Sequence, residues 1–335
     1  MRGAPPRRVA GGAGRGTLPG VPQGDRRSKC ADRLASPAGF RLWSPAVRRV
    51  LQLPDRGRLL VATDVQGNVA DFDRVTDAFE EAAKSRDGAY LVVTGDLVHG
   101  PELSEADWPD YLGSYYHGDS RTVLEHAREL SLRHPGRVHY LLGNHEHAHV
   151  GGPVVSKFFP DEAQRLEDLL GDQATRAMRD WLRTWPFVAV ASHARLVMLH
   201  AAPHARIRNP EDLERLPLDG FDTIPLEDMA TRGILGALLW ARTTTTDRGF
   251  EFIRALDPEA RVAVYGHDVA RAGFAVEREP LLCVSTSFGC FDGDKLYLEW
   301  DLAEPAESAR QTAKRGLKVL HPDSPPVHRD VYMHL

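Results

Sequence analysis

Short apolar runs that stop at a polar residue are the main pattern of the sequence. Five such runs are rich in Leu, Val, Ala or Tyr and are typical of buried strands: residues 59–63, 90–94, 137–141, 195–199 and 261–265. The polar residues that follow them are Asp64, Asp96, Asn144, His200 and His267. Between the first two runs, apolar residues recur at helical spacing. Strand, helix and strand in this order predict a βαβ unit with parallel strands.

Other elements follow from the same patterns. Asn68 is placed to cap the first helix, with Asp71 three residues on. A helix is expected over 121–132, another between Ala174 and Trp185, and a third from a cap at Asp247 to Leu256. Residues 187–199 are typical of a hairpin, and strands are expected at 281–285 and 296–302. Residues 204–235 show no pattern that assigns them.

The loop at residues 101–120 is rich in aromatic side chains and follows a predicted strand. Two interpretations are open: it covers a site at the strand tip, or it packs on itself. Its aromatic residues and its histidine are Trp108, Tyr111, Tyr115, Tyr116 and His117.

Composition divides the chain into three parts. Of its 335 residues, 42% are hydrophobic and 27% charged, as in soluble globular proteins. Residues 1–50 carry 11 Lys and Arg against 2 Asp and Glu, whereas the remainder carries 31 against 45. Residues 1–38 are rich in Gly, Pro and Arg, so 1–50 is expected to be a basic extension with a disordered start. It is either inert or an organellar transit peptide. Residues 51–303 form the folded domain, and 304–335 a tail with little pattern.

The same composition bears on partners and location. An acidic body argues against nucleic acid as a partner. No apolar run approaches the roughly 20 residues that cross a bilayer, so no membrane association is expected. The three cysteines, Cys30, Cys283 and Cys290, have neither disulfide-framework nor thiolate-metal spacing, which favours a cytoplasmic location. The oligomeric state has no signal in the sequence.

The polar strand tips point to metal chemistry. Strand ends on one edge of a sheet are where open α/β folds build their sites. Two carboxylates, one amide and two imidazoles form a mixed oxygen and nitrogen set suited to Mn, Fe, Zn or Mg. A carboxylate that bridges two such ions is the usual arrangement for phosphoryl chemistry. His145, His147 and His149 could form a separate zinc site, but solvent-facing loop histidines are the simpler expectation.

Taken in order, these motifs resemble those of the calcineurin-like metallophosphoesterases. That family's pattern is DxH, GDxx(D/H), GNH(E/D), a strand ending in His, and a late GH. The matching positions here, within about residues 58–302, are 64–66, 95–99, 143–146, 199–200 and 266–267. The resemblance implies an α/β fold, a four-layer α/β/β/α sandwich of two mixed sheets. Gly143 to Glu146 and the single-histidine motif at 266–274 look like the Ser/Thr phosphoprotein phosphatase branch, and residues 95–101 like the diadenosine tetraphosphate hydrolases.

Three positions depart from that pattern. Gln66 stands where the DxH histidine is expected, which weakens or removes one ligand of the first metal. His99 replaces an aspartate that orients the catalytic histidine in the phosphoprotein branch. Gly100 follows in place of a phosphate-binding arginine. Arg242 could hold the phosphate instead, or it could form a surface salt bridge.

The resemblance also implies a role for each site residue. Asp64 and Gln66 would hold the first of two divalent ions (Mn, Fe, Zn or Mg), and Asp96 would bridge to a second one held by Asn144, His200 and His267. Asn144 and Arg242 would contact the phosphate. His145 would protonate the leaving group, oriented by a carboxylate or by His99.

The implied reaction is hydrolysis of a phosphate monoester by metal-bound water, on a small molecule or a Ser/Thr phosphoprotein. Two alternatives stay open. One is a diadenosine polyphosphate hydrolase that stacks a base on Trp108 or Tyr115. The other is a catalytically weakened regulatory module, in which Gln66 has impaired the first metal site.

Overall fold

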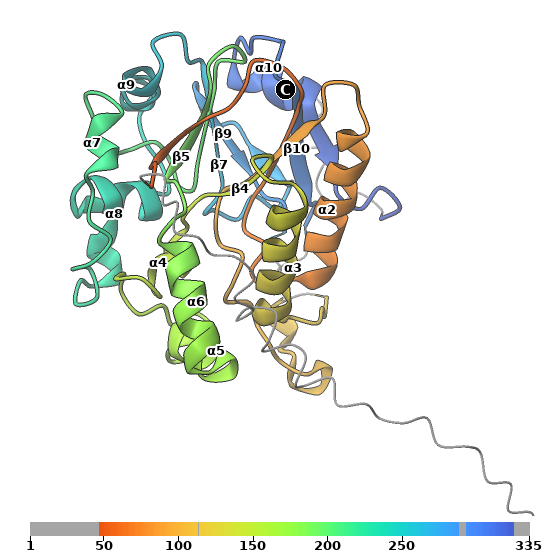
Figure 1. The fold of residues 1–335 in the computed structure, drawn as a ribbon, viewed down its shortest axis with the longest axis vertical. Coiled ribbons are helices and arrows are strands. Elements are labelled where there is room, and N and C mark those ends of the chain that lie inside the picture. The colour runs from red at the N-terminus through yellow and green to blue at the C-terminus, as the bar shows by residue number, and fades with distance from the viewer. Residues whose placement is uncertain (1–46, 113, 288–292, 325–335) are drawn as a thin grey trace, which may run out of the picture.

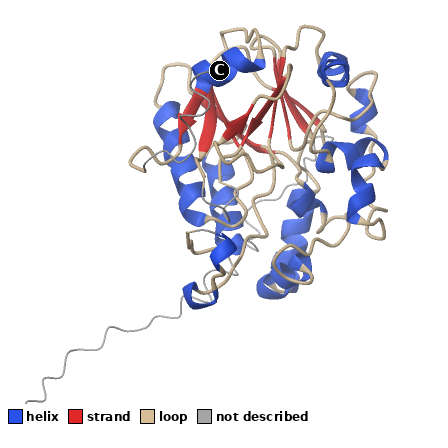
Figure 2. Ribbon diagram, turned by 180° about the vertical axis from the view of Figure 1, so that it is seen from behind, coloured by secondary structure: helices blue, strands red, loops and turns tan. Residues whose placement is uncertain are grey.

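Two β-sheets lie face to face between two layers of helices (Figures 1 and 2). The computed structural model describes residues 47–112, 114–287 and 293–324. The disorder expected of residues 1–38 lies outside these ranges. The α/β sandwich of two mixed sheets that the sequence predicted is confirmed.

The first sheet has five strands in the order β11-β10-β2-β3-β4. β2, β3 and β4 are parallel to one another, and β10 and β11 are antiparallel to their neighbours. The predicted βαβ unit is therefore present. The strands are β2 (Arg58–Ala62), β3 (Ala89–Val93), β4 (Val138–Tyr140), β10 (Leu296–Asp301) and β11 (Leu317–Val319).

The second sheet has six strands in the order β1-β5-β6-β7-β9-β8. β5 and β6 form the predicted antiparallel hairpin, and β6, β7 and β9 run parallel. β1 is parallel to β5, and β8 is antiparallel to β9. The strands are β1 (Val50–Gln52), β5 (Val188–Ala191), β6 (Leu196–Leu199), β7 (Val262–Tyr265), β8 (Phe274–Ala275) and β9 (Leu281–Val284).

Helices cover the outer faces of the two sheets, with α2 and α3 on one side of Figure 1 and α7 to α9 on the other. Their bounds are α2 (Val69–Ala83), α3 (Ser120–Arg133), α4 (Asn144–His147), α5 (Glu162–Leu170), α6 (Asp172–Leu182), α7 (Glu211–Glu214), α8 (Gly233–Trp240), α9 (Thr246–Leu256) and α10 (Ala309–Gly316). Three 3₁₀ turns lie at Glu105–Asp107, Asp110–Leu112 and Leu226–Thr231. No helix among the described residues is long and apolar enough to cross a membrane.

Two helix starts test the predicted caps. Asn68 does cap α2, because its side-chain oxygen accepts a hydrogen bond from the backbone N–H of Asp71 at 3.0 Å. The prediction for α9 was wrong by two residues. Thr245, not Asp247, is its N-cap, with the hydroxyl accepting from the N–H of Arg248 at 3.2 Å. The run of threonines before this helix offered several equivalent caps.

The alternation of side chains along each strand divides the apolar residues between two layers. Leu59 and Val61 of β2 pack with Met198 and Val264 of the opposite sheet, and this layer fills the space between the sheets. Leu60 and its alternate neighbours face outward and pack with the helices. Each fully buried Leu or Val contributes about 1.5–3 kcal/mol. The two buried layers hold the strand tips in fixed relative positions.

Part of the architecture had no counterpart in the sequence analysis. β1, β8, α5 and α8 were not predicted. Residues 304–335 were expected to be a tail with little pattern, but α10 and β11 lie within the described part of it. β11 extends the five-stranded sheet by pairing with β10, and its apolar signal is only three residues long.

Candidate active site

Loops that leave the carboxyl ends of β2, β3, β4, β6 and β7 meet at one place and bring together the polar tips predicted from the sequence. All five tip side chains are at most 5% exposed. The tips of β2, β3 and β7 are also held in an unusual backbone conformation, with positive φ angles of 47°, 55° and 65° at Asp64, Asp96 and His267. Gln66 and His99 in the same loops share it, at 47° and 67°. A positive φ angle strains the backbone of a residue other than glycine, and it persists only where the surrounding structure enforces it. Such residues are frequent at functional sites.

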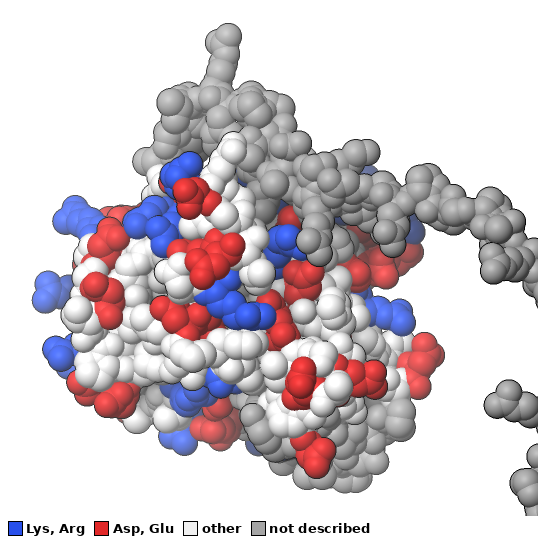
Figure 3. All heavy atoms as spheres, turned by 90° about the horizontal axis from the view of Figure 1, so that it is seen from below, with Lys and Arg blue, Asp and Glu red and all other residues white. Residues whose placement is uncertain are grey.

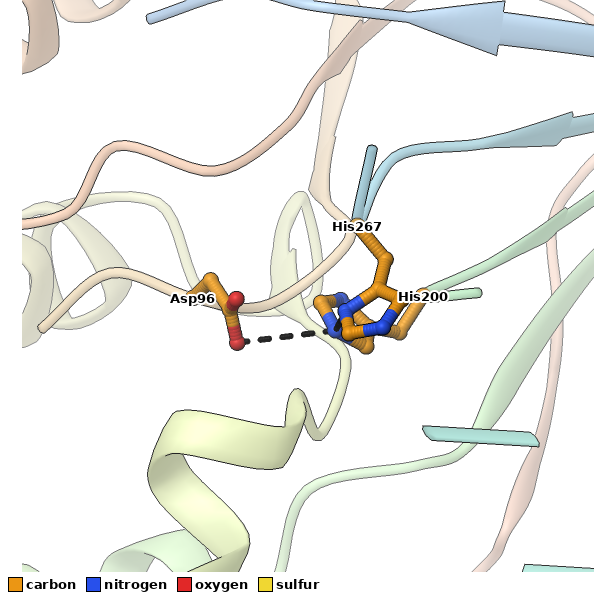
Figure 4. Close-up of side chains that lie close together, drawn as sticks. All are labelled: Asp96, His200 and His267. Carbon is orange, nitrogen blue, oxygen red and sulfur yellow. Dashed lines mark hydrogen bonds and ion pairs between the residues drawn. The ribbon is translucent and has the colours of Figure 1, made fainter. Parts of the chain in front are cut away.

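The imidazole of His200 lies at the centre of the first cluster, with Asp96 and His267 (Figure 4). Its Nε2 is 3.5 Å from Oδ1 of Asp96, 3.1 Å from Nδ1 of His267 and 2.8 Å from Oδ1 of Asn144. Nδ1 of His200 donates to the carbonyl oxygen of Thr94 at 3.0 Å, which leaves Nε2 without a hydrogen. Several lone pairs therefore point at one another.

This arrangement fits a bound metal ion. A cation between the converging lone pairs of Asp96, Asn144, His200 and His267 would turn their repulsion into coordination. Nε2 of His267 is buried and has no hydrogen-bond partner among the described residues. Burial raises the pKa of Asp96 to about 7, and it lowers the pKa of His200 to about 4. Both shifts reflect charged or polar groups packed together away from water.

Asp64 and Gln66 line the other side of Asp96. The carboxylate of Asp64 accepts the backbone N–H of His267, at 3.0 and 3.1 Å. Burial, with the charge of Asp96 adding to it, raises the pKa of Asp64 well above its usual value. A Cβ on Gly266 would lie 2.1 Å from Oδ2 of Asp64, so only glycine permits this approach.

The side chain of Gln66 is engaged by a lysine that the sequence analysis did not single out. Oε1 of Gln66 accepts from Nζ of Lys157 at 3.0 Å, and the Gln66 side chain also hydrogen-bonds Asp96. The ammonium of Lys157 lowers the pKa of both Asp64 and Asp96, in opposition to burial. A lone lysine in a loop gave no signal in the sequence. Its charge lies beside Gln66, the residue that stands at the position of the family's histidine ligand.

Glu146 joins two of the tip loops. Its Oε2 accepts the backbone N–H groups of Asp96 at 2.8 Å and of Gly143 at 3.2 Å, and its Oε1 accepts that of Leu97 at 2.8 Å. A Cβ on Gly143 would lie 2.4 Å from Oδ1 of Asp96. The carboxylate of Glu146 thus does not face the metal cluster. It holds the loop after β3 against the loop after β4.

His145 lies between this cluster and a second one. Its Nε2 is 3.8 Å from Oδ2 of Asp96, while its Nδ1 is 3.1 Å from Nδ1 of His99. Oε2 of Glu162 lies 3.7 Å from Nδ1 of His145 and 3.9 Å from that of His99. Burial lowers the pKa of both imidazoles, with neighbouring positive charges adding to it, and raises the pKa of Glu162 to about 7.

The histidines after the central strand are arranged differently from both sequence interpretations. His147 and His149 are buried, so the expectation of solvent-facing side chains was wrong. They also do not converge with His145 as a zinc site. Nε2 of His147 hydrogen-bonds the carbonyl oxygen of Leu218 at 2.8 Å, away from the cluster, whereas His149 contacts His99.

Arg242 and the aromatic loop lie near the metal cluster. Nη1 of Arg242 donates to the carbonyl oxygen of His267 and pairs with Asp268, both at 3.0 Å, and its side chain is 60% exposed. Within the loop, Trp108 makes edge contacts with Tyr115 and Tyr116. This supports the interpretation in which the loop packs on itself. On the end of the molecule seen in Figure 3, acidic and basic side chains are interspersed.

Comparisons with known proteins agree with this geometry. The sequence profile of calcineurin-like phosphoesterases matches residues 57–271. No curated protein matches the chain significantly. A serine/threonine phosphatase from Saccharomyces cerevisiae, with similarity to human phosphatase PP5, has a TM-score of 0.51 at 16% identity, covering 81% of this chain and 79% of that one. For a putative diadenosine tetraphosphatase the TM-score is 0.40 at 18% identity, covering 76% and 94%. At these identities the structural likeness bears on the fold alone.

Proposed function

Because this chain belongs to the calcineurin-like phosphoesterase family, whose members use divalent metal ions, we propose that it hydrolyses a phosphate monoester at the strand-tip cluster. One observation carries the proposal. His145 points its Nε2 toward Asp96, at 3.8 Å from Oδ2, next to a converging set of oxygen and nitrogen ligands. A proton donor beside a dinuclear ligand set is what ester hydrolysis requires.

The residues would divide between two ions. Asp96, Asn144, His200 and His267 form the stronger site. Asp64 and Gln66, with Asp96 as the bridge, form the weaker one, because Lys157 occupies the amide oxygen of Gln66. When bound, the ions supply Lewis acidity to the phosphoryl group and make a water molecule acidic enough to attack.

The rest of the reaction falls to this chain's own side chains. As a water oxygen bonds to phosphorus, the bond from phosphorus to the ester oxygen breaks, and its electron pair stays on that oxygen. His145 passes a proton from Nε2 to the departing oxygen, and the proton that the attacking water releases replaces it. The products are an alcohol and inorganic phosphate. No side chain forms a bond to phosphorus, so no phosphoenzyme is expected.

Two cations replace the arginine that is missing after His99. Arg242 lies against the backbone of His267 and exposes most of its guanidinium. The ammonium of Lys157 lies next to Gln66. We propose that both neutralise the phosphate dianion, with the amide of Asn144 as a third contact. Arg242 would exchange the carboxylate of Asp268 for the phosphate, since the N–H groups of a guanidinium can donate to either.

For the substrate, we propose a phosphomonoester, with phosphoserine or phosphothreonine in a protein as the candidate. The self-packed aromatic loop favours it over a dinucleotide, because Trp108 is already in contact with Tyr115 and Tyr116. The test compares kcat/KM for a phosphopeptide, an aryl phosphate and diadenosine tetraphosphate, each with Mn, Fe, Zn or Mg supplied. A tenfold preference for the dinucleotide, lost in Trp108→Ala, would assign the chain to the dinucleotide hydrolases. Absence of turnover with every metal would favour a regulatory module.

A further inference from the structure

Behind His145, on the side away from Asp96, an unbroken row of side chains leads to the surface. Nδ1 of His145 is 3.1 Å from Nδ1 of His99, and Nε2 of His99 is 2.9 Å from Nε2 of His149. Nδ1 of His149 is in turn 2.9 Å from Oε1 of Glu167. Nε and Nη2 of Arg179 donate to the two oxygens of Glu167, at 2.9 and 2.6 Å. The row thus contains three imidazoles and ends in a carboxylate paired with a guanidinium.

The row is shielded from water at its inner end and open at its outer end. The side chain of His149 is fully buried, that of Glu167 is 10% exposed, and that of Arg179 is 46% exposed. Glu167 comes from α5 and Arg179 from α6, two helices that pack on each other. The carboxylate is therefore held by a rigid helical pair.

The hydrogens along the row can be assigned by starting from Glu167. Hydrogen bonds from His149 and Arg179 outweigh burial and hold the pKa of Glu167 below its usual value, so the carboxylate only accepts. Nδ1 of His149 must then carry a hydrogen, and in the neutral ring Nε2 is the acceptor. His99 consequently donates from Nε2 and accepts at Nδ1. His145 completes the row by donating from Nδ1, which leaves its Nε2 facing Asp96.

We propose that Glu167, acting through His149 and His99, selects the tautomer of His145 and fixes the orientation of its ring. Glu167 is thereby the carboxylate that orients the catalytic histidine. The imidazoles of His149 and His99 separate it from His145. The kinetic consequences rest on the phosphomonoesterase function proposed above, whereas the tautomer assignment does not. Each hydrogen bond fixes the tautomer and ring orientation of the next residue, so Glu167 sets the direction in which Nε2 of His145 points.

Glu162 is nearer to His145 but does not take this role. Its Oε2 lies 3.7 Å from Nδ1 of His145 and 3.9 Å from Nδ1 of His99, beyond hydrogen-bond distance, and this oxygen has no hydrogen-bond partner among the described residues. The three atoms could instead bind a metal ion together. A metal there would require both Nδ1 atoms to be without hydrogen, the opposite of the assignment above for His145.

Nitrogen-15 NMR decides between these arrangements without any need for turnover. Long-range proton–nitrogen correlation spectra of the zinc-loaded, labelled protein distinguish the two tautomers of each histidine. We expect Nδ1–H for His149, Nε2–H for His99 and Nδ1–H for His145. Metal-shifted Nδ1 signals for both His99 and His145, or an Nε2–H tautomer for His145, would overturn the proposal.

Kinetics of Glu167→Gln then test the consequence for His145. Removing an outer hydrogen-bond partner of this kind typically costs about 10–100-fold, and we expect such a loss in kcat for an alkyl phosphate. The loss should be much smaller for dinitrophenyl phosphate, whose leaving group needs little protonation, and Glu167→Asp should restore part of it. A structural defect would lower both rates equally, and that result, like no loss at all, would refute the role.

A surface cluster of the same composition provides the matched control. Glu80 of α2 pairs with Arg133 of α3 and with Nε2 of the following His134, the latter at 3.0 Å, and neither helix contributes a side chain to the row behind His145. Glu80→Gln makes the same chemical change and should leave both rates unchanged. If the unaltered protein hydrolyses neither ester, the proposed function fails, and the tautomer spectra still decide the role of Glu167.

Discussion

Replacing Glu146 by glutamine would test how the two tip loops are held together. The carboxylate accepts three buried backbone N–H groups, those of Asp96, Leu97 and Gly143. Glutamine keeps one acceptor oxygen, which can serve Asp96 and Gly143, but its NH₂ group would then face the N–H of Leu97. An unpaired buried donor costs about 1–3 kcal/mol. We therefore expect Glu146→Gln to lower the free energy of unfolding by about that amount.

The assay is urea unfolding of the metal-free protein at pH 8, above the pKa of about 7 to which burial raises Glu146. Glu102→Gln is the control, because Oε1 of Glu102 accepts a single backbone N–H, that of Ser120, at 2.8 Å, and glutamine retains that oxygen. Metal titration should show about 10–100-fold weaker binding in Glu146→Gln, since the loop that carries Asp96 is displaced. A loss of stability no larger than that of the control would refute the reasoning.

Three further predictions concern metals, catalysis and acid stability. Gln66→His combined with Lys157→Ala should tighten the weaker metal site more than Gln66→His alone, and two equally tight sites in the unaltered protein would contradict this. His145→Asn should lower kcat by about 10²–10⁴-fold at unchanged metal content, less for good leaving groups. Burial raises the pKa of Asp71, but bonds from His321, Lys295 and Ser287 outweigh it and lower the pKa overall. Asp71→Asn should therefore cost about 3–5 kcal/mol at pH 7, and the difference should shrink as the pH falls below 3.8, as urea unfolding at several pH values would measure.

The strand tips could be predicted from the sequence because each is a local signal. An apolar run followed by Asp or His is visible in a window of ten residues, and parallel strands bring their carboxyl ends to one edge. Asp64, Asp96, Asn144, His200 and His267 meet for this reason. The positive φ angles at three of these tips have no such local signal, because they depend on the loops packed around them.

The missed strands and helices have a different cause. β11 has three residues and β8 two, which is too short for a hydrophobic period to appear. α10 carries buried alanine and glycine in place of large apolar residues, and these fit against Leu298 and Trp300 of β10. Such elements are specified by the surface on which they pack, so the sequence of the segment alone does not reveal them.

Residues of one segment, 149–167, lie beside the three departures from the family pattern, and only His149 among them had been singled out in the sequence. Gln66 has lost the charge-neutral imidazole of the motif, and Lys157 of this segment bonds its amide. His99 has replaced an aspartate, and His149, with Glu167 behind it, supplies a carboxylate at one remove. For the positive charge that the arginine absent at position 100 would supply, we propose Lys157 together with Arg242. Because each partner lies at least 50 residues from the position that it complements, no local pattern could connect them. The departures in the motifs therefore occur together with different residues around the site. They are poor grounds for interpreting the chain as an inactive relative.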